Sequence, residues 1–163
     1  MTDAAGWIDQ SYSGTTAPGR VSRFTFPGVL TNFAAFGATV KINLASKAFE
    51  VKASFTLGDR GMISLTAQPV TIETFYSGHS IMVTIPPGSF RQTQQGTFVF
   101  QGVIQGIQLA AELKPEGGKS YTLQVRGMRV PERSDLPSGN PVTVWLAIGN
   151  NGGSIEVNAE FPP

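Results

Sequence analysis

The sequence lacks cysteine altogether and contains a single histidine, His79. Without cysteine it can form no disulfide, no thiolate zinc site and no cysteine nucleophile. One histidine cannot supply a histidine zinc set, and any Ser-His-Asp triad would need His79. Because Ser77-Gly78-His79 has the composition of a tight turn between two strand patterns, we interpret His79 as a polar residue at a hairpin tip. We therefore expect no enzyme, and no catalytic, metal-binding or cofactor-binding residues.

Charged residues are also scarce, at 14% of the chain against about 25% in an average soluble domain. The 12 basic and 11 acidic residues nearly cancel, and no run of lysine or arginine occurs, so the sequence argues against nucleic-acid binding. The carboxylates are scattered, mostly on the polar phase of strand-like segments. This pattern disfavours both the paired carboxylates of a glycosidase and a calcium-binding loop.

Long apolar runs are missing as well. No stretch approaches the ~18 apolar residues of a membrane-spanning helix, so we expect no membrane insertion. The N-terminal residues lack the basic start and apolar run of a signal peptide. The low charge and the many Thr, Ser and Gly residues favour a bacterial extracellular or cell-surface setting, from which a signal peptide would already have been removed.

From residue 21 onward, apolar and polar residues alternate with the period of two that is typical of strands. Turn signals such as Asn150-Asn151-Gly152-Gly153 separate the runs, and the 19 glycines and 11 prolines fit many short strands joined by tight turns. We expect about ten strands. The clearest apolar alternations lie in residues 40–44, 49–57, 70–72, 81–85, 98–100, 107–113, 121–125, 142–148 and 155–161.

Two segments differ from this pattern. Residues 28–36, GVLTNFAAF, are the one helix candidate, because Leu30, Phe33 and Ala34 would share a helical face. Residues 1–27 are predicted to form an extended N-terminal arm, since they begin with a Gly/Ser/Thr-rich stretch without regular periodicity.

An internal repeat organises the remainder. Gln68-Pro69-Val70-Thr71-Ile72 recurs 72 residues later as Asn140-Pro141-Val142-Thr143-Val144, and residues 49–52 match residues 121–124 at the same offset. Residues 80–83 align with residues 154–157 at an offset of 74, which implies two extra residues in a turn of the second copy. Residues 42–45 align with residues 107–110.

These observations predict an all-β chain with an arm over residues 1–27 and a single β-sandwich domain over residues 28–163. Within the domain, pseudo-repeats span about residues 37–95 and 96–163. Each half has one apolar strand face, and the direct way to bury two such faces is to pack them on each other. We expect an antiparallel β-sandwich or flattened barrel built from two pseudo-repeated halves.

Residues 37–161 resemble a module of uncharacterised bacterial proteins that are often extracellular and often repetitive. The resemblance lies in residues 83–90, VTIPPGSF, in the hairpin of residues 98–113, and in residues 141–149. It implies a β-strand fold and an extracellular setting, and it implies no activity. The chain departs from similar modules at residues 149–152, where they tend to carry acidic residues, which argues against a cation role for that turn.

Two sets of residues are candidates for contacts with partners. In the arm, Val21, Phe24 and Phe26 could dock as an added strand. Trp145 lies out of phase with Val144 and Leu146, so it projects from the opposite face of its strand. There it could stack on a sugar, or be covered by the arm or a partner subunit. Tyr76 is a second candidate ligand contact.

The sequence therefore favours a non-catalytic structural or assembly subunit that self-associates into a homo-oligomer, polymer or filament. Edge strands or an N-terminal donor strand would form its contacts, and the sequence leaves open whether the arm docks in cis or in trans. The alternative is a β-sandwich module that binds carbohydrate or another surface ligand, for which Trp145 must be accessible to solvent. We expect no cofactor in either case.

Overall fold

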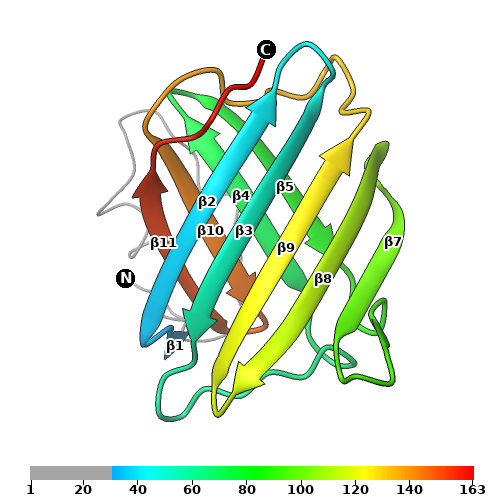
Figure 1. Cartoon of the computed structure of the whole chain (residues 1–163), viewed down its shortest axis with the longest axis vertical. Coiled ribbons are helices and arrows are strands. Elements are labelled where there is room, and N and C mark those ends of the chain that lie inside the picture. The colour runs from blue at the N-terminus through cyan, green and yellow to red at the C-terminus, as the bar shows by residue number, and fades with distance from the viewer. Residues whose placement is uncertain (1–30) are drawn as a thin grey trace, which may run out of the picture.

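The computed structural model describes residues 31–163, which form eleven strands and no helix (Figure 1). The strands make two sheets that pack face to face as a sandwich. The five-stranded sheet has the order β1 (Thr31–Asn32), β11 (Asn151–Val157), β10 (Val142–Ile148), β4 (Val70–Tyr76) and β5 (His79–Ile85). The six-stranded sheet has the order β2 (Ala35–Asn43), β3 (Ala48–Thr56), β9 (Ser120–Met128), β8 (Ile107–Gly117), β7 (Phe98–Ile104) and β6 (Arg91–Gln92).

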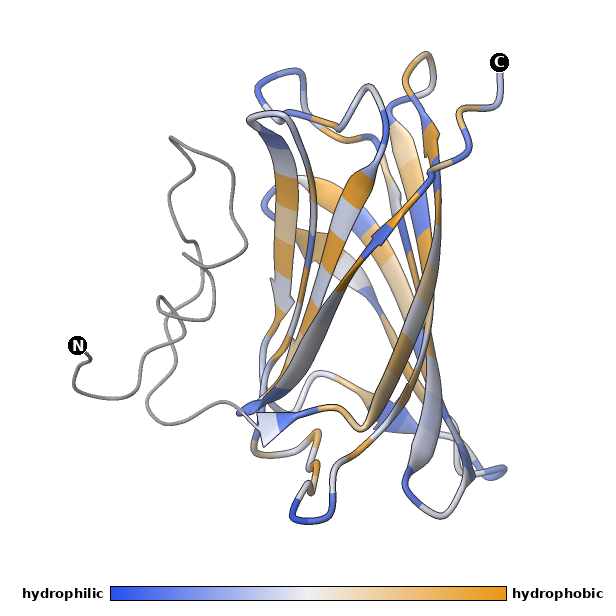
Figure 2. Cartoon of the chain, turned by 90° about the vertical axis from the view of Figure 1, so that its left-hand side faces the viewer, coloured by the Kyte–Doolittle hydropathy of each residue, from blue (hydrophilic) through white to orange (hydrophobic). Residues whose placement is uncertain are grey.

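The predicted alternation of faces is confirmed. Along β3, Phe49, Val51, Ala53 and Phe55 are buried in the core between the sheets. The residues between them turn to the face that points away from the other sheet, called here the outer face. Figure 2 shows this alternation as bands of hydrophobic and hydrophilic colour along the strands. Every strand pair is antiparallel except the short pairing of β1 with β11.

Two expectations are corrected. The sheets do not close into a barrel, so the flattened-barrel alternative is wrong. The helix candidate is also wrong over its described part, because residues 31–32 and 35–36 lie in β1 and β2. Phe33 stacks on Phe55 with ring centroids 4.6 Å apart, and Ala35 to Asn43 pair with β3. This packing and pairing outweigh the weak helical pattern.

Strands related by the 72-residue offset pair with each other. In the six-stranded sheet Lys52 of β3 lies opposite Gln124 of β9, which is 72 residues later. In the five-stranded sheet Glu73 of β4 lies opposite Trp145 of β10, again 72 residues later. Such a pair lies on a local twofold axis, because the neighbouring pairs on its two sides exchange roles. The strands β2-β3-β4-β5 and β8-β9-β10-β11 are thus related by a pseudo-twofold rotation.

The strand registers correct two of the repeat alignments. Ile72 pairs with Val83 and its equivalent Val144 pairs with Ile155, so the offset stays 72 through the hairpin and no residues are inserted. In β2, Ile42 pairs with Phe49, whereas Tyr121, the equivalent of Phe49, pairs with Pro115. Residues 42–45 therefore do not correspond to residues 107–110. Both errors are shifts by an even number of residues, which leave the alternation of faces unchanged and so cannot be seen in the pattern.

Candidate interaction surfaces

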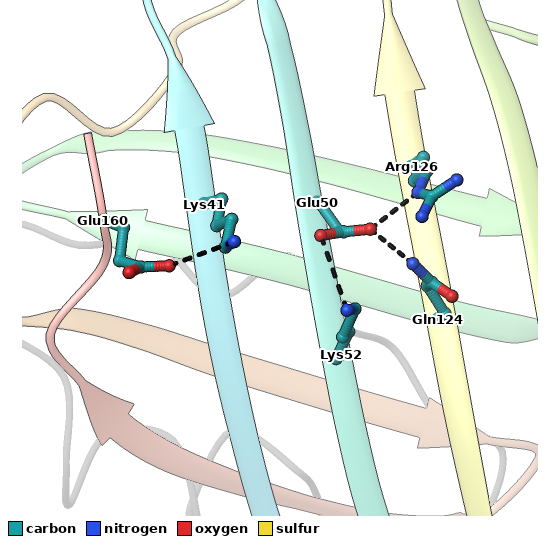
Figure 3. Close-up of polar contacts among 6 residues, drawn as sticks. All are labelled: Lys41, Glu50, Lys52, Gln124, Arg126 and Glu160. Atoms are coloured by element: carbon teal, nitrogen blue, oxygen red, sulfur yellow. Dashed lines mark hydrogen bonds and ion pairs between the residues drawn. The ribbon is translucent and has the colours of Figure 1, made fainter. Parts of the chain in front are cut away.

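A polar cluster occupies the outer face at the centre of the six-stranded sheet (Figure 3). Glu50 of β3 receives a hydrogen bond from Arg126 Nε at 2.6 Å and one from Gln124 Nε2, both on β9. Lys52 Nζ lies 4.0 Å from the other carboxylate oxygen of Glu50. The cluster forms because Glu50 and Arg126 are directly opposite in the register, as are Lys52 and Gln124.

The charge state of Glu50 follows from these neighbours. Partial burial on its own would raise the pKa of the carboxyl group. The hydrogen bonds from Arg126 and Gln124, together with the positive charges of Lys52 and Arg126, outweigh that effect and lower the pKa below its ordinary value. Glu50 is therefore held as a carboxylate by groups that already satisfy it. This is the chemistry of a structural ion pair more than that of a general base.

A hollow of about 720 Å³ lies beside this cluster, on the side of β7 and β8. Two shallower hollows of about 460 and 510 Å³ continue along the outer faces of β2, β3 and β9, where Gly37, Ser54 and Thr122 provide little side-chain volume. The polar side chains that line the first hollow belong to Ser89, Arg91, Gln101, Glu112, Gln124 and Arg126. The sequence analysis missed this surface, because the lining is assembled from strands distant in the chain.

The outer face of the five-stranded sheet is different, because its centre is buried. Trp145 of β10 is 7% exposed, Ala147 is 5% exposed, and Glu73 of β4 is fully buried. Trp145 and Glu73 lie directly opposite each other on the face away from the core, since Ile72, Val144 and Leu146 occupy the core side. A stacking platform needs an accessible ring. The burial of Trp145 therefore weighs against a sugar-stacking role for this residue.

The other proposed ligand contact, Tyr76, lies at the end of β4 and is half-buried against the core. Its ring packs on Gly139, where a Cβ atom would fall 2.4 Å from the ring carbon Cζ. The structure also brings together two residues that the sequence analysis treated separately. His79 Nδ1 lies 3.9 Å from Asp135 Oδ1, and both side chains are more than half exposed. This is an open, solvated pair at the β4–β5 hairpin.

Within residues 31–163 no group of three or more His, Cys, Asp and Glu side chains is arranged to hold a metal ion. No helix long and apolar enough to cross a membrane occurs in the same part of the chain. The arm residues Val21, Phe24 and Phe26 lie outside the described residues.

The edge strand β5 is the last interaction surface. It pairs with β4 on one side, and no strand of the described residues pairs with it on the other. Tyr76 and His79 flank a two-residue turn and form its closing hydrogen-bonded pair. Hydrogen-bonded and non-hydrogen-bonded pairs alternate from there, so the backbone N–H groups of Met82 and Thr84 point away from β4.

Fold and surfaces together define a two-sheet antiparallel β-sandwich with a polar hollow on one outer face and a buried tryptophan–carboxylate pair on the other. No protein-family description, no curated protein and no solved structure matches this chain.

Proposed function

We propose that this chain is a non-catalytic structural subunit that self-associates outside the cell, through the β5 edge strand or an N-terminal donor strand. The observation that supports this proposal most directly is the chemistry of β5. From Ser80 to Ile85 the strand contains no charge, no proline and no recorded bulge. These are the devices by which soluble sandwiches normally block pairing at an edge.

The other long edge of the sandwich provides a contrast within the same molecule. The outer edge of β2 is covered by the C-terminal segment, where Ile42 N donates to Glu160 O at 2.8 Å and Glu160 N donates to Val40 O at 2.9 Å. A covered β2 and an unprotected β5 leave one seven-residue edge on which a second copy of this chain can add a strand.

Substitutions of Thr84 test the edge directly. Thr84→Pro removes a backbone N–H that points away from β4, and it also removes the hydroxyl contact to Thr71 Oγ1 at 2.9 Å. Thr84→Val removes the same hydroxyl but keeps the N–H, so it is the matched control. The measurement is the mass of the full-length protein by light scattering over a range of concentrations.

We expect oligomers for the wild type and Thr84→Val, and monomers for Thr84→Pro. If Thr84→Pro associates as well as Thr84→Val, the edge is not the contact, and a chain starting at Gly28 then tests the donor-strand route. A wild type that stays monomeric at every concentration would overturn the proposal.

A second candidate function is ligand binding on the outer face of the six-stranded sheet. The hollow of about 720 Å³ presents two arginines, two amides and one carboxylate, which are groups that hydrogen-bond to sugar hydroxyls. Screening against immobilised glycans, with Gln101→Ala as the hollow variant and Ser154→Ala on the opposite sheet as control, separates this function from assembly. Loss of a glycan signal in Gln101→Ala alone would support it.

A further inference from the structure

We infer that the outer face of the five-stranded sheet is the docking site of residues 20–26 of the same chain, with Arg20 paired to the buried carboxylate of Glu73. This inference deepens the proposed assembly function, because it assigns the arm a place on its own sandwich and leaves the β5 edge as the contact between copies.

The first step is the burial of this face. Glu73 has no exposed surface and Trp145 has 7%. Both project away from the core, yet among the eleven described strands none packs on this side of the sheet. Their burial therefore requires a cover other than a strand of the sandwich. The cover must be apolar where it meets the indole ring of Trp145.

The second step is charge. A carboxylate that is completely removed from solvent needs a cationic or strongly hydrogen-bonding partner. Thr74 and Phe75, which follow Glu73 in β4, carry no charge, and Trp145 and Met82 lie opposite Glu73 on the two neighbouring strands. In the sequence of residues 1–30 the only basic side chains are Arg20 and Arg23. A cover drawn from this segment can thus supply a cation.

The third step is phase. In an extended segment alternate side chains share a face, so Arg20, Phe24 and Phe26 point to one side and Arg23 points to the other. The side with two aromatic rings and one guanidinium matches a surface of one indole ring and one carboxylate. This selects Arg20 over Arg23 as the partner of Glu73.

The fourth step is reach. The described chain begins at Thr31, beside Asn151 on β11. Glu73 lies two strands further across the sheet and level with Ser154. With strands about 4.8 Å apart and about 3.3 Å per residue, the span is roughly 14 Å. The eleven residues from Arg20 to Thr31 extend to roughly 36 Å, so docking on the same molecule needs no second copy.

Limited proteolysis of the full-length chain tests the docking. Trypsin cleaves after Arg23, and docking should slow that cut. We expect Glu73→Gln to accelerate cleavage after Arg23 by about tenfold or more, because local release precedes cleavage. The control Glu50→Gln, on the outer face of the other sheet, should leave the rate unchanged. Equal rates in the wild type and Glu73→Gln would overturn the inference.

A second measurement distinguishes the two arginines. In a Trp7→Phe background, fluorescence quenching by acrylamide reports Trp145 alone. Arg20→Gln should increase quenching of Trp145, and Arg23→Gln should not. Equal effects of the two substitutions would contradict the assigned pair. Unfolding curves of each variant confirm that it is folded.

The dependence on concentration separates this inference from the assembly proposal. Protection after Arg23 that is independent of protein concentration supports docking on the same chain, whatever the mass by light scattering. Protection that appears only with oligomers would show an arm from another copy and would overturn the inference while leaving assembly in place. A protected monomer would support the inference and overturn assembly.

Discussion

Glu50 shows how a carboxylate can be stabilised on an open sheet face. Its side chain is 18% exposed, and one oxygen accepts hydrogen bonds from both Arg126 and Gln124. All the partners lie on β3 itself or on the adjacent β9, so the sheet register alone determines the cluster. A carboxylate held in this way stabilises the fold only while it is ionised.

The variant Glu50→Gln tests this dependence on pH. At neutral pH we expect the variant to be less stable by ~0.5–1 kcal/mol, as for other well-formed surface ion pairs. Because the folded pKa of Glu50 is lowered, the wild-type advantage is complete above the ordinary value of 4.5. It is lost as the pH falls through the folded pKa.

Urea unfolding of both proteins between pH 7 and pH 3 measures that difference. Glu156→Gln, which alters an exposed carboxylate on β11, is the control. A stability difference that stays constant over the whole pH range would show that the charge of Glu50 does not contribute.

At the scale of elements, the C-terminal segment acts as a cover for β2. Asn140 fixes this segment through two hydrogen bonds, one donated to Ala159 O at 3.0 Å and one accepted from Ala159 N at 2.6 Å. Glu160 then pairs with the β2 edge through its backbone, and its side chain lies 3.5 Å from Lys41 Nζ. Two independent contacts thus hold a short segment along an edge that would otherwise be open.

Replacing Glu160 by proline should release this cover. Glu160→Pro removes the N–H that donates to Val40, and we expect amide hydrogen exchange at Ile42 to accelerate by roughly tenfold. Glu160→Ala keeps the N–H and removes only the exposed ion pair, so its exchange rate should match the wild type. Similar acceleration in both variants would mean that the side chain, and not the backbone, holds the segment.

The strands and their faces could be predicted from the sequence, because burial of one face imposes a period of two, as in residues 49–57. The strand partners could not, since a shift by two residues preserves that pattern. The Glu50–Arg126 cluster depends on pairing between residues 76 positions apart, so it was not predicted. The outward projection of Trp145 was predicted from its phase, whereas its burial depends on a cover that strand periodicity does not reveal.

At the scale of the whole molecule, the pseudo-twofold axis passes through one residue pair in each sheet. Lys52 lies opposite Gln124 in one sheet, and Glu73 lies opposite Trp145 in the other. In both pairs one residue is charged and the other is neutral. The two halves are therefore least alike in side-chain charge at the positions where they meet on the axis.

Restoring symmetry at one of these positions should lower stability. Gln124→Lys places a second ammonium group directly opposite Lys52 and beside Arg126, and like charges opposed across strands are destabilising. We expect a loss of about 1 kcal/mol relative to Gln124→Met, a neutral side chain of similar length. The deficit should shrink as salt is added, because both groups lie near the surface. Chemical unfolding at low and high salt measures it, and a deficit that does not respond to salt would point to packing.

The axial pairs also determine what a single polypeptide permits that two separate half-chains would not. In a homodimer of identical halves, each axial position would face its own copy at the ~5 Å of a directly opposed strand pair. Glu73 would then meet a second glutamate, and Lys52 a second lysine. Joining the halves covalently lets the two copies diverge at these positions, so one chain can place a charge on its own axis where a symmetric dimer would repel itself.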